Sequence, residues 1–156
     1  MDLPPLPPDV QFVLLPKTDE AFRFTFEVKR SAMGPYIDEK WGWNEEYQHE
    51  THRRHFNAKP FFQIVYQREN VGTVSFDRCD SYFRFGEFYL FPPFQRKGFG
   101  TRILRHCVNV ADGYGLPVRL EHLKWNPVGS LYKRNGFSTV GESEIHFFME
   151  RPFHNR

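Results

Sequence analysis

The strongest constraint on the fold is an amphipathic helix that begins directly after a glycine-rich turn. Its apolar face consists of residues that recur at three- and four-residue spacing: Phe99, Ile103, Leu104, Cys107, Val108 and Ala111. Its polar face consists of Arg102, Arg105, His106, Asn109 and Asp112. Before Pro92 and Pro93 the chain is instead rich in the aromatic and branched residues of strands. The pattern therefore predicts a helix that packs on a sheet.

The elements around this helix follow from the same reasoning. Strands are expected at 11–15, 61–67, 72–77, 82–91 and 117–123, with a closing hairpin at 137–140 and 145–149. One helix, capped by Thr18 or Asp19, should stop near Gly34–Pro35. Two others are expected, one at 45–56 with Asn44 as its N-terminal cap and one at 128–135 with Gly136 as its C-terminal cap. The order predicts an α/β (α+β) fold, with a mixed, mostly antiparallel central sheet and helices on both faces. We expect a proline-rich tail at 1–9 and a single domain at 10–156.

Composition narrows the class of protein. The chain is 40% hydrophobic and 26% charged, which is typical of a globular domain, and it has no apolar run long enough to cross a bilayer. Cys79 and Cys107 are too far apart to suggest a disulfide framework or a metal site, so a cytoplasmic location is expected. The net charge of +2 does not favour nucleic acid as the main partner.

The turn before the amphipathic helix has the features of a phosphate site. It reads Gln95-Arg96-Lys97-Gly98-Phe99-Gly100-Thr101, and the unpaired N–H groups of a helix start attract anions. Glycines let a pyrophosphate approach the backbone, and Arg96 and Lys97 add positive charge. A lone Gly-x-Gly is more often an ordinary turn, so this motif alone is weak.

A second block of residues makes the pattern more specific. It includes Leu120-Glu121-His122-Leu123-Lys124-Trp125-Asn126-Pro127 and then Leu131-Tyr132-Lys133-Arg134-Asn135-Gly136-Phe137. Together with 90–100, this block resembles the GNAT (Gcn5-related N-acetyltransferase) superfamily, whose pattern runs in the same order. The resemblance implies that the chain is an N-acetyltransferase that uses acetyl-CoA as cosubstrate and needs no metal.

The resemblance also implies roles for individual residues. Phe88, Tyr89 and Leu90 would bond the pantetheine arm through their backbone, and residues 95–101 would hold the pyrophosphate. Asn126 would contact the pantetheine arm as well. Tyr132 matches the tyrosine that protonates the leaving thiolate, and Glu121 matches the general base of ribosomal-protein alanine acetyltransferases.

The chemistry of amide formation suits these residue types, but structural alternatives remain. An amine must lose a proton before it attacks, and a tyrosine with a pKa of about 10 stays protonated at neutral pH and can donate. Tyr132 could instead be a core aromatic residue. Glu121 could be a bystander paired with Arg119, with Glu87 as a second candidate base.

The region before the strands offers candidate acceptor contacts. Trp41, Trp43 and Tyr47 lie among acidic residues, which suggests a cationic amine with an apolar body. The alternative is that the tryptophans anchor a helix to the sheet. The histidines at 49, 52 and 55 are three apart, but a polar helical face is a better interpretation than a metal site.

Three functions remain in competition. The leading one is acetyl transfer, with acetyl-CoA and an amine acceptor as partners. No membrane or nucleic-acid partner is expected, and a homodimer is one possible oligomeric state. The second is a non-catalytic acyl-CoA-binding sensor or interaction module. The third is nucleic-acid binding through Arg53 and Arg54.

Overall fold

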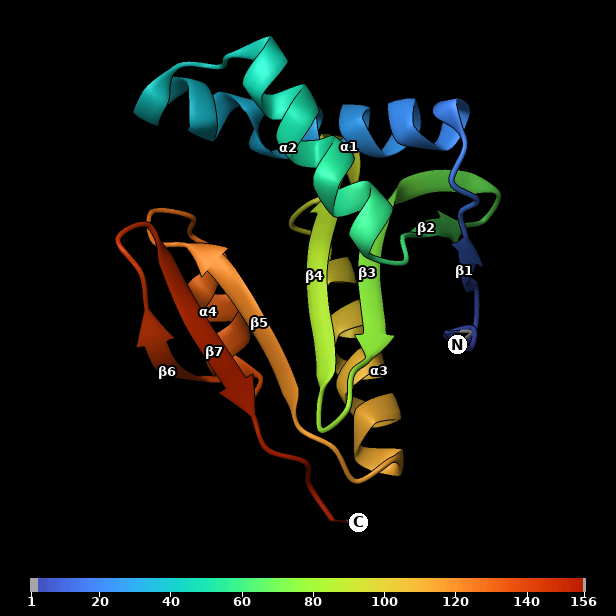
Figure 1. Ribbon diagram of the computed structural model, residues 1–156. Coiled ribbons are helices and arrows are strands. Elements are labelled where there is room, and N and C mark those ends of the chain that lie inside the picture. The colour runs from blue at the N-terminus through green and yellow to red at the C-terminus, as the bar shows by residue number, and fades with distance from the viewer. Residues whose placement is uncertain (1–2, 156) are drawn as a thin grey trace. The chain divides into compact units, whose positions relative to one another are not determined.

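The computed structural model describes residues 3–155 and consists of alternating strands and helices (Figure 1). The strands are β1 (Val10–Leu14), β2 (Phe62–Tyr66), β3 (Glu69–Arg78), β4 (Phe83–Leu90), β5 (Val118–Leu123), β6 (Ser138–Glu142) and β7 (His146–Arg151). The helices are α1 (Asp19–Trp41), α2 (Glu45–Ala58), the 3-10 turn η1 (Pro92–Phe94), α3 (Phe99–Gly113) and α4 (Gly129–Arg134). The predicted order of elements is confirmed.

All seven strands belong to one sheet, in the order β1-β2-β3-β4-β5-β7-β6. The pairs β1–β2, β2–β3, β5–β7 and β6–β7 are antiparallel, and β4–β5 is parallel. Only Phe83 and Arg84 of β4 pair with β5, opposite Val118 and Arg119. The predicted mixed, mostly antiparallel sheet in a single α/β domain is therefore confirmed.

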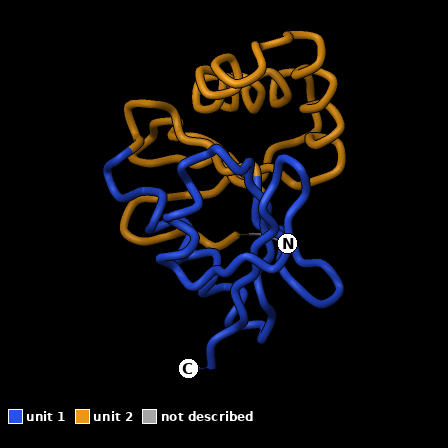
Figure 2. Tube along the Cα trace, turned by 90° about the vertical axis from the view of Figure 1, so that its left-hand side faces the viewer, with its two compact units in different colours: residues 1, 76–86, 96–156 blue, residues 2–75, 87–95 orange. Residues whose placement is uncertain are grey.

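Within this domain the chain divides into two compact units, coloured separately in Figure 2. Unit 1 contains residues 76–86 and 96–156, and unit 2 contains residues 2–75 and 87–95. In unit 1, the apolar face of α3 is buried as its periodicity predicts. In unit 2, α1 and α2 lie side by side (Figure 1), and Ala21, Phe22, Phe56 and Phe61 form an aromatic core. Each unit is described separately below.

The predicted end of α1 is wrong. The helix does not stop at Gly34–Pro35 but continues to Trp41, with Pro35 inside it. A proline inside a helix removes one backbone hydrogen bond. Met33 and Ile37, which flank it, are buried, and their burial favours continuation of the helix.

Turn chemistry explains the other difference in unit 2. Glu69 and Asn70 were expected in the loop between two strands, but they begin β3. The turn is made instead by Gln67 and Arg68, whose φ angles of 49° and 66° are both left-handed. Two such residues give the twist that a tight hairpin needs. Glutamine and arginine do not specifically favour the left-handed conformation, so the sequence did not predict a turn at these two residues.

The two predicted N-terminal caps in unit 2 are present. The side chain of Thr18 accepts a hydrogen bond from the Ala21 amide, and that of Asn44 accepts one from the Tyr47 amide. In the segment predicted as a tail, Leu3 is buried and Leu6 forms a β-bridge with Val10. Residues 1, 2 and 156 lie outside the described part of the chain.

Candidate active site

The predicted phosphate turn in unit 1 has an open helix start. Gly98 is the N-cap of α3, and its φ of 85° lies in the left-handed region that favours glycine. No side chain caps the helix, and its first backbone bond runs from the Arg102 amide to the Gly98 carbonyl. The amides of the first turn are thus not held by a capping side chain, and Arg96 and Lys97 are exposed beside them. This arrangement can bind an anionic phosphate group.

The end of β4 in unit 2 carries the residues predicted to bond the pantetheine arm. Phe88, Tyr89 and Leu90 are half-buried. Glu87, just before them, has a φ of 47°, which is unusual for a non-glycine residue inside a strand. Its carbonyl accepts a hydrogen bond of 3.1 Å from the Thr73 hydroxyl. The strand is therefore irregular directly before Phe88.

Two contacts hold this irregular segment in place. A side chain at Gly72 would place its Cβ 2.0 Å from the Tyr89 carbonyl oxygen, so only glycine fits there. The Gln95 side chain donates a hydrogen bond of 2.9 Å to the Leu90 carbonyl. Gln95, predicted to contact phosphate, thus also ties the following loop to the end of β4.

Tyr132 lies in an aromatic environment within unit 1. It is 6% exposed, and its ring packs against those of Phe85, His122 and Phe137 at centroid distances of 6.2, 5.8 and 5.8 Å. Burial raises the pKa of its hydroxyl above the ordinary value of 10.0. The group stays protonated at neutral pH, as a proton donor must.

Glu121 is exposed on β5 and differs from the prediction in its surroundings. Arg119 does not pair with Glu121; it pairs with Glu150 on β7 at 2.8 Å. Side chains alternate along a strand, and His122 contacts Tyr132, so Glu121 and Tyr132 lie on opposite faces of β5. Asn126, at the end of this segment, accepts a hydrogen bond of 3.1 Å from the Val128 amide and so shapes the start of α4.

Glu87 is the centre of a buried charged cluster in unit 2 that the sequence analysis missed. Its side chain is 6% exposed, and its Oε1 atom lies 3.1 Å from His55 Nδ1 and 3.3 Å from Lys59 Nζ. Although burial opposes the charged form, His55, Lys59 and Lys29 lower the pKa of Glu87 to about 2. Its Oε2 atom is buried without a hydrogen-bond partner.

His52 and Lys29 extend this cluster. The Thr25 hydroxyl donates to the Phe22 carbonyl, so it accepts from His52 Nε2 at 2.7 Å. His52 Nδ1 then carries no proton and is buried without a partner. Burial, and next the charge of Lys29, lower the pKa of His52 to about 4. The expected polar helical face for this histidine is wrong, because His52 is fully buried.

A sequence signal for the cluster does exist. Phe22, Phe26, Lys29 and Met33 follow one another at helical spacing, which places a lysine on the apolar face of α1. A lysine at such a position is seldom fully buried unless it is paired. The contribution of Glu87 could not be read in the same way, because it depends on a left-handed residue within a strand.

The aromatic residues predicted to contact the acceptor are placed differently from one another. The Trp43 indole stacks on Phe26 at 6.1 Å, donates to Glu45 at 2.7 Å and lies beside Arg30. Trp41 and Tyr47 are 52% and 61% exposed. Trp43 therefore packs against α1 and the start of α2, whereas the side chains of Trp41 and Tyr47 are exposed.

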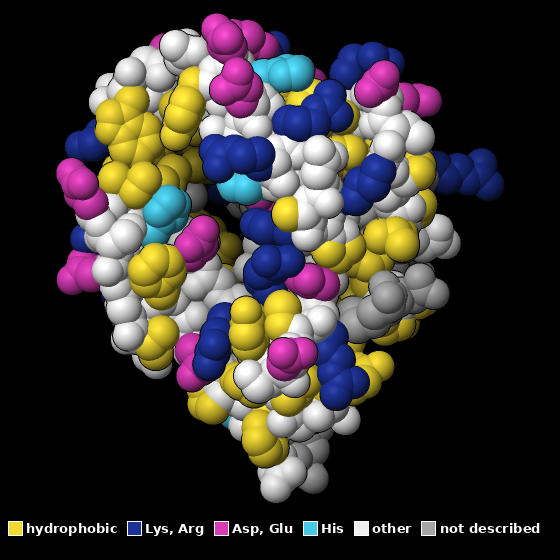
Figure 3. All heavy atoms as spheres, in the orientation of Figure 1, with side chains coloured by type: hydrophobic (Ala, Val, Ile, Leu, Met, Phe, Trp, Pro, Cys, Tyr) yellow, Lys and Arg dark blue, Asp and Glu magenta, His cyan; other side chains and the backbone are white. Residues whose placement is uncertain are grey.

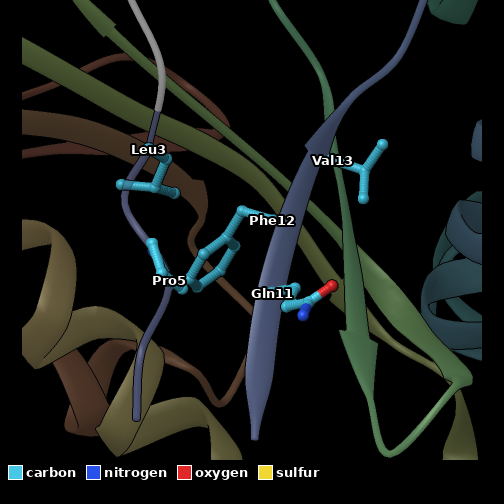
Figure 4. Close-up of a pocket in the computed structure, with 5 residues that line it drawn as sticks. All are labelled: Leu3, Pro5, Gln11, Phe12 and Val13. Carbon is cyan, nitrogen blue, oxygen red and sulfur yellow. The ribbon is translucent and has the colours of Figure 1, made fainter.

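Other surfaces offer less chemistry. A cavity of about 250 Å³ is lined by Leu3, Pro5, Gln11, Phe12 and Val13, none of them charged. In Figure 4, Phe12 points toward Leu3 and Pro5, whereas Gln11 and Val13 point away from the opposite side of β1. On the face in Figure 3, basic and acidic side chains are interspersed.

The described part of the chain has neither a candidate metal site nor a candidate membrane-spanning helix. Across residues 3–155, no three His, Cys, Asp or Glu side chains form a group that could hold a metal ion. Nor does any helix there have the length and apolar character needed to cross a membrane.

Known structures share this fold. The PaiA N-acetyltransferase of Thermoplasma acidophilum, solved with coenzyme A, has a TM-score of 0.73 and 20% identity, covering 94% of this chain and 100% of that one. A protein of Pyrococcus horikoshii has a TM-score of 0.74 and 22% identity, with the same coverage. The ribosomal-protein-S18-alanine N-acetyltransferase of Escherichia coli has a TM-score of 0.66 and 16% identity, covering 94% of this chain and 96% of that one.

Sequence comparison is more specific about the family. No curated protein sequence matches the chain significantly. The profile described as "Acetyltransferase (GNAT) family" matches residues 22–137, which include most of α1, the irregular end of β4, the open start of α3 and Tyr132. Because the match spans most of the sequence, the chain belongs to the GNAT acetyltransferase family.

Proposed function

We propose that this protein transfers the acetyl group of acetyl-CoA directly to an amine. The amine nitrogen attacks the thioester carbonyl carbon, a C–N bond forms and the C–S bond breaks. The nitrogen loses a proton and the departing thiolate gains one. The observation that carries the proposal is the uncapped start of α3 behind the left-handed Gly98, within a chain of the GNAT family.

The donor is held mainly by backbone groups in this proposal. The amides of the first turn of α3, with Arg96 and Lys97, bind the pyrophosphate of acetyl-CoA. The backbone of 88–90, which directly follows the irregular position at Glu87, is proposed to bond the pantetheine arm. Asn126 adds a contact to the same arm.

Tyr132 is the proposed general acid. Its buried, protonated hydroxyl supplies the proton that the leaving thiolate needs. Burial that keeps the hydroxyl protonated also disfavours the phenolate that donation leaves behind. Prompt return of a proton to Tyr132 is therefore part of the proposed cycle.

Glu121 is the proposed general base; because it lies on the opposite face of β5 from Tyr132, it would take the proton of the amine through water rather than directly. The properties of Glu87 support the choice of Glu121. A carboxylate whose pKa is held at about 2, as that of Glu87 is, is a poor proton acceptor near neutral pH. The exposed Glu121 can exchange protons with solvent after each turnover. Trp41 and Tyr47 are the proposed aromatic contacts of the acceptor, since their side chains are exposed.

The experiment that tests this function measures release of free thiol from acetyl-CoA across a panel of amines, together with calorimetric binding of CoA. Thiol release that depends on an amine, with formation of the matching N-acetyl product, supports transfer. Binding of CoA without amine-dependent release would instead identify an acyl-CoA sensor. Absence of CoA binding would remove both functions.

A further inference from the structure

We propose that Lys29 and Glu87 bind an acceptor that carries a carboxylate as well as its amine, as an α-amino acid does. The inference rests on the proposed acetyl transfer, because it names the substrate class of the same site. It is carried by two buried side chains of unit 2 that are opposite in charge: Lys29, which is 7% exposed, and Glu87, whose Oε2 atom has no hydrogen-bond partner.

Lys29 is the first of these side chains. It lies on the apolar face of α1, is 7% exposed, and forms no ion pair or hydrogen bond with any residue from 3 to 155. A buried charge is normally paired, because leaving water without a partner is costly. Lys29 therefore has the position and the charge to receive an anion.

Glu87 is the second. Its Oε1 atom is occupied by His55 and Lys59, whereas its Oε2 atom is buried with no hydrogen-bond partner. A buried hydrogen-bond acceptor that has lost its water and has no partner destabilises the folded state. The carboxylate is close enough to Lys29 for their charges to interact, but the two side chains do not form an ion pair with each other.

The charges of Lys29, Lys59 and Glu87 indicate which kind of ligand could contact both Lys29 and Glu87. Lys29 and Lys59 supply two positive charges, and Glu87 supplies one negative charge. A water molecule could satisfy both open hydrogen bonds, but it would leave one positive charge uncompensated. A ligand with a carboxylate for Lys29 and an N–H donor for Glu87 Oε2 satisfies both atoms and the charge.

The position of Glu87 along the chain places the acceptor nitrogen near the donor. Glu87 directly precedes Phe88, the first residue proposed to bond the pantetheine arm. Since the hydrogen bond from His55 and the charges of Lys59 and Lys29 hold the Glu87 pKa at about 2, this carboxylate accepts a hydrogen bond from the nitrogen without taking its proton. In the proposed mechanism the proton goes to the general base Glu121. The role of Glu87 is therefore to orient the nucleophilic nitrogen and not to deprotonate it.

The test compares α-amino acids with the amines that they give on decarboxylation, for example phenylalanine with phenethylamine, by thiol release. The parent protein is expected to have a kcat/KM at least about tenfold higher for the amino acid of a pair. In Lys29→Met the KM of the amino acid should rise at least about tenfold, while that of its decarboxylated partner stays unchanged. Equal kcat/KM values within the pairs in the parent would overturn the inference.

Two further variants separate charge from packing. Lys29→Arg keeps the positive charge and should keep the preference for amino acids. Lys40→Met removes an exposed lysine from the end of the same helix and should behave as the parent. Loss of the preference in Lys40→Met, or its retention in Lys29→Met, would contradict a site at Lys29.

Calorimetric binding of amino acids in the presence of CoA keeps this inference distinct from the proposed function. Amino-acid binding that is lost in Lys29→Met supports the carboxylate site even if no thiol is released, and in that case only the proposed transfer fails. Failure of every amino acid to bind overturns the site, while thiol release with other amines would leave the transfer standing.

Discussion

The Oε1 atom of Glu87 lies 3.3 Å from the Nζ atom of Lys59, and their side chains are only 6% and 20% exposed. Glu87→Gln removes the negative charge of this buried pair and leaves positive neighbours uncompensated. We expect it to lower the free energy of unfolding by about 3 kcal/mol. The measurement is urea unfolding at pH 7.

Glu142→Gln is the matched control for this variant. Its partner Lys124 is 2.5 Å away, but Glu142 is 60% exposed. Solvent screens such a pair, so the loss should stay below about 1 kcal/mol. Similar losses in both variants would show that burial of the Glu87 pair contributes nothing to stability.

The buried His52 predicts a dependence of stability on pH. Its folded-state pKa of about 4 lies below the ordinary histidine value of 6.5, so between these pH values the unfolded chain binds more protons than the folded chain. The stability is therefore full above pH 6.5 and decreases as the pH falls toward 4. From pH 7 to pH 5 the loss attributable to His52 is about 2 kcal/mol.

His52→Gln removes the titrating group, and the exposed His49 on the same helix provides the control. Unfolding of the parent, His52→Gln and His49→Gln is compared at pH 7 and pH 5. The difference between the two pH values should shrink only in His52→Gln. An unchanged difference in that variant would show that His52 is not the group responsible.

The phosphate turn predicts a loss of affinity confined to the charged part of the donor. Replacing Arg96 and Lys97 together with alanine should weaken CoA binding about tenfold, because two charge-assisted contacts are removed. Pantetheine, which lacks the pyrophosphate, should bind as before. Calorimetry with both ligands measures this, and Lys133→Ala on α4 is the control. An equal loss for pantetheine would mean that the turn does not contact phosphate.

Trp43 and Trp41 lie two residues apart and should respond differently to substitution by alanine. Trp43 stacks on Phe26 and donates to Glu45, so Trp43→Ala should lower the stability by about 1–3 kcal/mol. Trp41 is 52% exposed, so Trp41→Ala should leave the stability within about 0.5 kcal/mol and raise the KM of the acceptor. A loss of stability in Trp41→Ala and a raised acceptor KM in Trp43→Ala would contradict this assignment of the packing role to Trp43 and the acceptor contact to Trp41.

Regular patterns made most of the fold predictable. The spacing of apolar residues from Phe99 to Ala111 identified α3, and Thr18 and Asn44 marked the starts of α1 and α2 through side-chain caps. Local chemistry decides such features, so one sequence is enough to read them. The continuation of α1 past Pro35 was missed because burial of Met33 and Ile37 is a tertiary effect.

The candidate site was predictable only in part. Gly98 and the residues after it formed a recognisable turn, and Tyr132 followed from the resemblance. Lys29 on the apolar face of α1 was a readable signal, but the rest of the cluster was not predictable, because Glu87 pairs with His55 and Lys59, which lie far from it in the sequence. The sequence predicted that side chains alternate along β5. Only the structure showed that His122 contacts Tyr132, and hence which face of β5 Glu121 occupies.

The most direct test of acetyl transfer is a single-turnover measurement of thiol release with saturating acetyl-CoA and an accepted amine, for the parent and for Tyr132→Phe. The substitution keeps the ring that packs against Phe85 and Phe137 and removes only the hydroxyl group, the proposed proton donor. We expect the rate to fall by about 10²- to 10⁴-fold, with CoA affinity and thermal stability unchanged. A Tyr132→Phe rate equal to that of the parent would contradict the account.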